Sequence, residues 1–184
     1  MNQKNIEILK NGGVGVIPTD TIYGLVGSAF SPAAVSRLFK IKGRAENKPP
    51  VIIISALADL EKFGITVSVA QSDFIKKYWP GKVTVIFAID EKFAYLDKGL
   101  GLAVRLPADD NLRAILKQTG PLATTSANLQ SQPPAKNIAA AEKYFGSAVD
   151  FYEDGGEMDS LPSTLVRLSG GQVEILRPGA VKID

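Results

Sequence analysis

Short apolar runs alternate along the chain with segments in which apolar residues recur every three or four positions. The runs are typical of buried strands and the recurring segments of helices, so their alternation predicts an α/β fold. The expected strands are 14–17, 51–55, 82–89, 101–106, 122–125, 148–152, 164–168 and 172–176. The expected helices are 31–40, 68–78, 109–118 and 138–145, with a short helix before Gly64 that Ser55 is expected to cap.

Local signals set the arrangement of these elements. Ser31 followed by Pro32 is typical of a helix start, with a capping hydroxyl and a proline at the first helical position. The residues between 82 and 89 place Val83, Val85, Phe87 and Ile89 on one face, which is the period of a strand. The last two strands are joined by Ser-Gly-Gly and predict a hairpin. Hairpins mixed with strand–helix–strand units predict a mixed sheet, and no shift in composition marks a linker, so residues 1–184 are expected to form one domain.

The composition excludes several kinds of chemistry. The chain has no Cys and no His, so disulfides, thiolate nucleophiles, Cys/His zinc sites and imidazole bases are all excluded. The net charge of +2 is too balanced to indicate nucleic-acid binding by itself. The polar first residues and the shortness of the longest apolar run, 51–54, predict a cytoplasmic protein without a membrane span.

Polar segments follow several of the expected strands, where α/β folds place ligand sites. They are 18–25, the basic stretch 37–48, 124–128, and 162–164 with 175–180. Each also has a purely structural interpretation: a turn with a core tyrosine, cations at a helix C-terminus, a turn rich in side-chain bonds, and surface arginines. Together they predict a cavity walled by hydroxyls, Lys and Arg, which suits phosphates and carboxylates.

Other candidates are weaker. The chain contains no P-loop, dinucleotide fingerprint or G-x-S-x-G motif. A nucleophilic Ser126 is not expected, because no histidine is present to activate it and a Ser–Lys pair would be the sole route. The acidic residues between 150 and 159 are interpreted as a solvated loop rather than a metal site.

These segments occur in the order and spacing of a known family. The motifs are P-T-D-T-I-Y-G-L at 18–25, K-G-R at 42–44, A-V-R-L-P at 103–107, T-S-A-N at 125–128, S-T at 163–164 and L-R-P-G at 176–179. On these motifs the chain resembles the YrdC/TsaC family of L-threonylcarbamoyladenylate synthases, from about residue 14 to 181, and in particular the short bacterial form. The resemblance implies a twisted mixed α/β sheet with flanking helices around a large basic concavity.

The resemblance also implies an activity. ATP, L-threonine and bicarbonate or CO₂ would give threonylcarbamoyl-AMP and pyrophosphate, and a separate transferase complex would use the product to modify tRNA. ATP is a substrate here, and Mg²⁺ is expected with no fixed protein ligand. Carried over by position, the residues implied for ATP are Lys42, Arg44, Ser126, Asn128 and Arg177, with Lys42 and Arg44 also implied as catalytic. The residues implied for threonine are Thr19, Tyr23, Arg105, Thr124 and Ser163.

Two positions depart from the family pattern, and alternatives stay open. Ile53 stands where longer members have a histidine near the threonine site, and Pro134 stands where a nucleotide-side hydroxyl is common. The main alternative is a YciO-like paralogue that binds RNA, double-stranded RNA included, or nucleotides without synthase activity. A carbamoyl-transfer role like that of related domains in hydrogenase-maturation proteins fits less well, because the zinc-finger domains beside those need cysteines.

Overall fold

The computed structural model of the protein describes residues 1–43, 49–97, 99–169 and 172–184. The α-helices are α1 (Gln3–Lys10), α2 (Pro32–Ile41), α3 (Val69–Tyr78), α4 (Asp110–Thr119) and α5 (Ile138–Phe145). Short 3₁₀ helices are η1 (Leu57–Phe63), η2 (Glu91–Phe93) and η3 (Gly146–Ala148). The strands are β1 (Val14–Pro18), β2 (Tyr23–Ser28), β3 (Val51–Ile53), β4 (Val83–Phe87), β5 (Leu102–Arg105), β6 (Leu122–Ser126), β7 (Phe151–Tyr152), β8 (Thr164–Ser169) and β9 (Gln172–Arg177).

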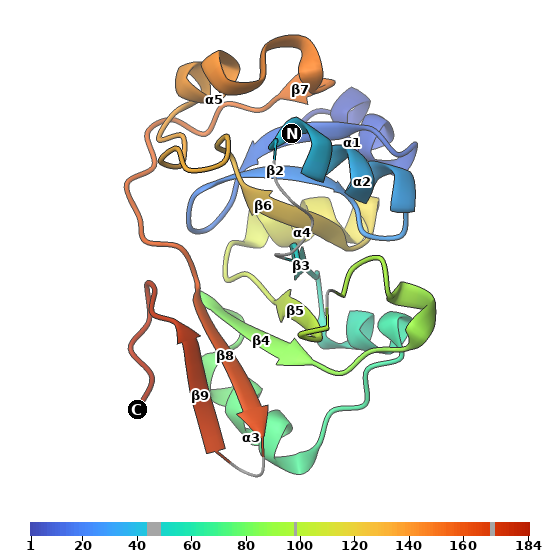
Figure 1. Cartoon of the computed structure of the whole chain (residues 1–184), viewed down its shortest axis with the longest axis vertical. Coiled ribbons are helices and arrows are strands. Elements are labelled where there is room, and N and C mark those ends of the chain that lie inside the picture. Colours follow the sequence, from blue (N-terminus) through green and yellow to red (C-terminus); the bar gives the residue numbers. More distant parts are fainter. Residues whose placement is uncertain (44–48, 98, 170–171) are drawn as a thin grey trace.

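Within the described ranges the strands form one sheet in the order β7-β1-β2-β6-β3-β5-β4-β8-β9 (Figure 1). The pairs β1–β7, β3–β5 and β4–β8 are parallel, and the others are antiparallel. The predicted mixed sheet and the predicted final hairpin, β8–β9, are therefore confirmed. One sheet that runs through the described chain makes this a single α/β domain.

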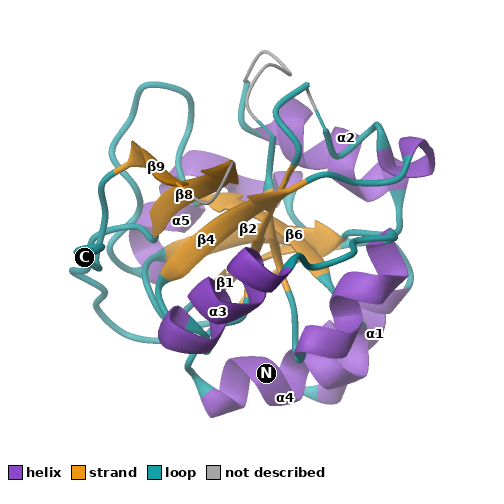
Figure 2. Ribbon diagram, turned by 90° about the horizontal axis from the view of Figure 1, so that it is seen from below, coloured by secondary structure: helices purple, strands orange, loops and turns teal. Residues whose placement is uncertain are grey.

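Helices cover both faces of the sheet. On one face α1 and α4 pack side by side (Figure 2) over a core cluster that includes Leu9, Val26 and Leu116. On the other face the larger cluster holds the apolar sides of α2, α3 and α5. No helix in the described ranges is both long and apolar enough to cross a membrane.

The start of α2 shows how local sequence sets an element. The Ser31 side chain accepts a hydrogen bond from the Ala34 amide at 3.2 Å, and Pro32 is the first helical residue, as predicted. Val35, Leu38 and Phe39 are buried against the sheet. The cap and the apolar stripe together fix where the helix begins and which face it buries.

Two expectations for local structure differ from what is observed. Strand β3 ends at Ile53 rather than at residue 55, and Ala56, not Ser55, is the cap residue of η1. The Ser55 hydroxyl instead donates to Asp59, whose Oδ2 also accepts from the amides of Ser55 and Ala56. The carboxylate organises this helix start because it can accept several amide protons at once.

Helix α1, strand β2 and the short helices η2 and η3 were not expected from the pattern. Helix α1 has a polar sequence but buries Ile6 and Leu9 one turn apart. Strand β2 follows the P-T-D-T turn directly and lies between β1 and β6. It brings the polar segment at 18–25 into contact with the one at 124–128.

Candidate functional site

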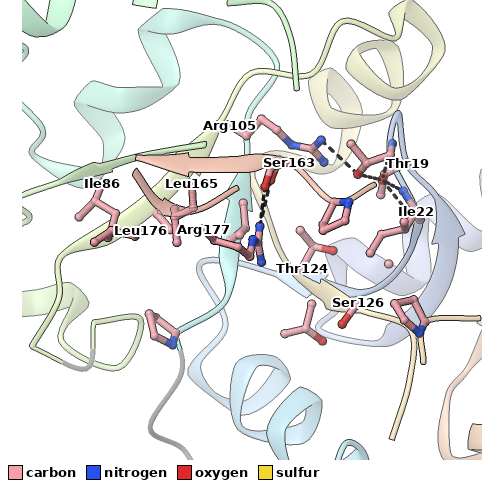
Figure 3. Close-up of a pocket in the computed structure, with 18 of the residues that line it drawn as sticks. Thr19, Ile22, Ile86, Arg105, Thr124, Ser126, Ser163, Leu165, Leu176 and Arg177 are labelled. Carbon is pink, nitrogen blue, oxygen red and sulfur yellow. Dashed lines mark hydrogen bonds between the residues drawn. The ribbon is translucent and has the colours of Figure 1, made fainter. Parts of the chain in front are cut away.

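A cavity of about 570 Å³ lies over the middle of the sheet and its β8–β9 end (Figure 3). Its walls come from the 19–24 segment, β3, β4, β5, β6, β8, β9 and the turns around 49, 100, 134 and 162. Three of the polar segments named above, 18–25, 124–128 and the pair 162–164 with 175–180, therefore meet in one place. Of the fourth, the basic stretch 37–48, residues 44–48 lie outside the described residues, and its described cations Arg37, Lys40 and Lys42 are not among the wall residues.

The cavity has two halves of different character. Figure 3 shows Ile86, Leu165 and Leu176 grouped on one side and hydroxyl-bearing Thr19, Thr124 and Ser126 on the other. The apolar residues come from β4, β8 and β9, which are neighbours at one end of the sheet. Such a division suits a ligand with an apolar part and a polar, charged part.

Three arginines supply the charge of the cavity walls. They are Arg105 on β5, Arg167 on β8 and Arg177 on β9, and no described wall residue is an acid. Arg105 is only 3% exposed, and its NH1 lies 2.8 Å from Asp20 Oδ1. Arg167 NH1 lies 3.6 Å from Glu174 at the surface. The charge of these walls suits an anion, and a buried counter-charge, Asp20, lies behind one of them.

The pKa values of two arginines show how closely this charge is packed. Burial lowers the pKa of Arg105, while Asp20 opposes that shift and the positive charge of Arg177 adds to it. Burial also lowers the pKa of Arg177. Both guanidinium groups remain protonated in a protein, and an anion placed between them would relieve their mutual repulsion.

The turn before β2 is held by threonine hydroxyls. Thr19 Oγ1 donates to the Ile22 carbonyl at 2.7 Å and accepts from the amides of Thr21 and Ile22. The proton of the Thr19 hydroxyl is used in the hydrogen bond to Ile22, so Thr21 is the donor in the 3.1 Å contact between the two hydroxyls. Thr19 lines the cavity, but its hydroxyl is largely used in folding the turn.

Tyr23 joins this turn to the loop after β7. Its side chain is fully buried, and its hydroxyl donates to the Gly156 carbonyl and accepts from the Gly155 amide, both at 2.8 Å. Burial is the main cause that raises the pKa of the Tyr23 phenol. Segment 18–25 is therefore a turn with a core tyrosine, as its structural interpretation predicts. The same segment also forms part of the cavity wall.

Lys42 supports the Ser126 segment from behind the wall. Its ammonium donates to the Ser126 carbonyl at 2.6 Å and to Asn128 Oδ1 at 2.8 Å. Ser126 Oγ in turn donates to Asn128 Oδ1 at 2.6 Å, which is the bracing contact expected of Asn128. Lys42 is buried, and neither Lys42 nor Asn128 is among the wall residues. In this arrangement both residues position Ser126.

The end of β9 is tied to the segment before β8. Arg177 NH2 donates to the Ser163 carbonyl at 2.8 Å, and the Ser163 hydroxyl contacts Thr84 Oγ1 at 2.7 Å. A Cβ on Gly179 would lie 2.6 Å from the backbone carbon of Ser163. The L-R-P-G motif therefore needs its glycine because two backbones meet there.

The structure brings together most of the residues implied by the resemblance. Those that line the cavity are Thr19, Tyr23, Arg105, Thr124, Ser126, Ser163 and Arg177. Arg44 lies outside the described residues. Ile53 is fully buried with Leu122 and is not among the wall residues, whereas Pro134 is one of them.

Sequence reasoning did not assign several wall residues. They are Thr21, Thr125 and Arg167, and the apolar set Ile86, Leu100, Leu165 and Leu176. Thr21 and Thr125 lie inside the 18–25 and 125–128 motifs, so the sequence already indicated that they are near the site. Arg167 alternates with buried Val166 on β8, and that alternation would have placed it on the cavity face.

The acidic residues between 150 and 159 pair separately with different parts of the chain. Asp150 pairs with Arg37 at 2.6 Å, and Asp159 pairs with Lys136 at 2.7 Å. Asp154 contacts the Tyr23 hydroxyl. No group of three or more metal-ligating side chains occurs in the described ranges. The cavity walls there offer hydroxyls and guanidinium groups rather than carboxylates, a donor set that does not suit a protein-held Mg²⁺.

Comparison with known proteins identifies the family. Residues 7–179 match the Sua5/YciO/YrdC family model, whose description is "Telomere recombination". The Homo sapiens protein named threonylcarbamoyl-AMP synthase is 32% identical over 185 residues, covering 93% of this chain and 64% of the human protein.

Solved structures agree with this match. P. abyssi Sua5, solved in complex with L-threonine, superposes with a TM-score of 0.89 at 28% identity, over 96% of this chain and 53% of that one. This chain thus spans about half of the P. abyssi protein. E. coli YciO has a TM-score of 0.87 at 22% identity, covers 97% of this chain and 89% of its own, and shows the same fold. The chain belongs to the Sua5/YciO/YrdC family.

Proposed function

We propose that this protein is an L-threonylcarbamoyl-AMP synthase, which converts ATP, L-threonine and bicarbonate or CO₂ into threonylcarbamoyl-AMP and pyrophosphate. The observation that carries the proposal is the cavity itself, in which Arg105 and Arg177 share one space with hydroxyl groups from several segments. The carboxylate of an amino acid and the phosphates of a nucleotide each suit a cationic anchor of this kind. The name of the human relative points to the same reaction.

The two halves of the cavity suggest where each substrate binds. Arg105, next to the threonine-rich turn, is the natural partner for the carboxylate of L-threonine, with Thr124 and Ser163 nearby on the wall. Arg177 and Ser126 would contact the phosphates of ATP, and Lys42 and Asn128 would hold Ser126 in place. The apolar group of Ile86, Leu165 and Leu176 offers a surface for a planar base.

The reaction needs no covalent enzyme intermediate. The amine of threonine adds to CO₂ and loses a proton, and an oxygen of the resulting carbamate attacks the α-phosphorus of ATP while pyrophosphate leaves. The protein would contribute by aligning the two substrates and by offsetting the negative charge that builds up on the phosphates. Mg²⁺ would enter on the phosphates of ATP, as part of that substrate.

The chemical lability of the product implies a partner that uses it. Threonylcarbamoyl-AMP is a mixed anhydride that hydrolyses readily, so a transferase complex would take it up and modify an adenosine of tRNA. The chain itself has a modest charge of +2, and Arg105, Arg167 and Arg177 line a cavity. We therefore place RNA with the transferase step.

Pyrophosphate release tests the proposal. The purified protein is given ATP and Mg²⁺, with threonine and bicarbonate added singly and together. Release that requires both additions supports the synthase. Release with ATP alone, or none under any condition, contradicts it and favours the YciO-like nucleotide- or RNA-binding alternative, which a salt titration of tRNA binding would then examine.

A further inference from the structure

Asp20 has no role in the assignments above, and its surroundings are unusual. Its side chain is 6% exposed and does not line the cavity. Its two carboxylate oxygens are buried, and among the described residues neither accepts a hydrogen bond of normal geometry. In the described ranges its charge is compensated by the 2.8 Å approach of Arg105 NH1 to Oδ1. A buried charge is costly unless it is paired, so this contact fixes both groups.

The same edge of the Arg105 guanidinium has a second support. NH1 lies 3.3 Å from Thr21 Oγ1, to which it donates. The Thr21 hydroxyl in turn donates a hydrogen bond to Thr19 Oγ1, and Thr19 Oγ1 donates to the Ile22 carbonyl. Figure 3 shows the guanidinium turned toward this turn. The turn therefore holds one edge of Arg105 through a carboxylate and a chain of hydroxyls.

The other edge of the guanidinium has no protein acceptor for its Nε among the described residues, and Arg105 lines the cavity. Arg105 Nε is buried and has no hydrogen-bond partner in the described part of the chain. An unsatisfied buried donor costs free energy until a ligand accepts from it. A carboxylate binds a guanidinium best through two parallel hydrogen bonds along one edge.

We propose that Asp20 is the positioning residue for Arg105: its buried carboxylate holds the NH1 edge of the guanidinium and so leaves the Nε edge to receive the substrate carboxylate. The identity of that carboxylate as L-threonine rests on the proposed function. The contact between Asp20 and Arg105 NH1 does not depend on the proposed function. Without Asp20 the guanidinium would turn toward solvent or bind a stray anion, and the carboxylate site would lose its shape.

The test uses Asp20→Asn, which removes the charge and keeps the shape, and Asp73→Asn, at an exposed position of α3, as its matched control. The first readout is the ¹⁵N–¹H spectrum of arginine Nε groups, in which the Arg105 signal is assigned by its loss in Arg105→Lys. We expect a slowly exchanging Arg105 signal in the wild type that is shifted or lost in Asp20→Asn and unchanged in Asp73→Asn. An Arg105 signal that stays the same in Asp20→Asn overturns the proposal.

Calorimetric titration with L-threonine and with ATP is the second readout. We expect Asp20→Asn to weaken threonine binding by roughly 10- to 150-fold, the loss of one charged hydrogen bond, and to leave ATP binding within about twofold. Equal weakening of both ligands, or of neither, overturns the positioning role. If the wild type binds no threonine, the proposed function fails, and the spectrum alone then decides the role of Asp20.

Discussion

The ammonium group of Lys42 lies 2.6 Å from the carbonyl oxygen of Ser126, 84 residues further along the chain. The same ammonium contacts Asn128 Oδ1, and the Gln130 amide donates to the Lys42 carbonyl. Lys42 thus secures the loop after β6 both by its side chain and by its backbone. A cation at the end of α2 acts here as the support of a cavity wall.

Replacing Lys42 should therefore weaken the fold and the site together. Lys42→Met keeps most of the volume and removes the donor, leaving the Ser126 carbonyl and Asn128 without it. We expect a loss of about 1.5–3 kcal/mol in the free energy of unfolding and a raised KM for ATP. Urea unfolding and steady-state kinetics measure the two effects. Lys40→Met, at an exposed position of the same helix, is the control; a Lys42 variant as stable as this control contradicts the account.

Arg177 is expected to act mainly on ATP. Arg177→Ala removes a guanidinium from the cavity wall, and the loss of one charged hydrogen bond should lower kcat/KM for ATP by roughly 10- to 150-fold. Arg44→Ala should have an effect of the same order, a prediction that rests on the sequence motif. Lys182→Ala, an exposed cation near the C-terminus, serves as the control. Unchanged kinetics in both arginine variants would remove the basis for the phosphate assignment.

Gly179 should not tolerate a side chain. A Cβ at this position would lie 2.6 Å from the Thr164 amide nitrogen, so Gly179→Ala must push the segment at 162–164 away. We expect about 1–3 kcal/mol of destabilisation together with weaker use of threonine, because Ser163 moves with the segment. Thermal unfolding and the KM for threonine report the two effects. Ala180→Ser, at the exposed next position, should have the stability and the KM of the wild type. A Gly179→Ala variant with the same wild-type values would contradict the claim that the two backbones leave no room for a side chain here.

The pH dependence of stability should show the pairing of Asp150. Hydrogen bonds from Arg37 are the main cause that holds the pKa of Asp150 below its ordinary value, with the Val14 amide adding to them. A depressed folded pKa gives stability that is present above the unfolded pKa of about 3.9 and lost as the pH falls through the folded value.

Asp150→Asn should accordingly be less stable than the wild type at neutral pH. We expect a difference of about 1 kcal/mol, because the pair is partly exposed, and convergence of the two proteins as the pH falls through the lowered folded pKa of Asp150. Urea unfolding across this pH range measures it. A difference that is independent of pH would mean that shape rather than charge is involved.

Several elements followed directly from local sequence. Helix α5 has the predicted bounds, because Asn137 caps it and Gly146 follows its last residue. Strand β4 shows the predicted face: Val83, Val85 and Phe87 enter the core, while Ile86 lies on the cavity side. The cap residues and the strand alternation lie within or next to the elements that they predict, so the sequence alone is enough to recognise them.

Other features depend on distant contacts. Strand β2 contains Gly24 and Gly27, which lower its strand propensity, and it exists because β1 and β6 pair with it on either side. The meeting of Lys42 with Ser126, and of Arg105 with Asp20, joins segments 84 and 85 positions apart in the sequence. The sequence could show that these residue types were suited to anions. Only the folded chain shows which of them line the cavity and which support it.

The most direct test of the central claim is identification of the product. The protein is incubated with ATP, L-threonine and ¹³C-labelled bicarbonate, and the mixture is examined at once by mass spectrometry. The account predicts threonylcarbamoyl-AMP that carries the label, formed together with pyrophosphate and absent when threonine is omitted. Consumption of ATP without any labelled adenylate, or no reaction by a folded protein that binds both substrates, would contradict it.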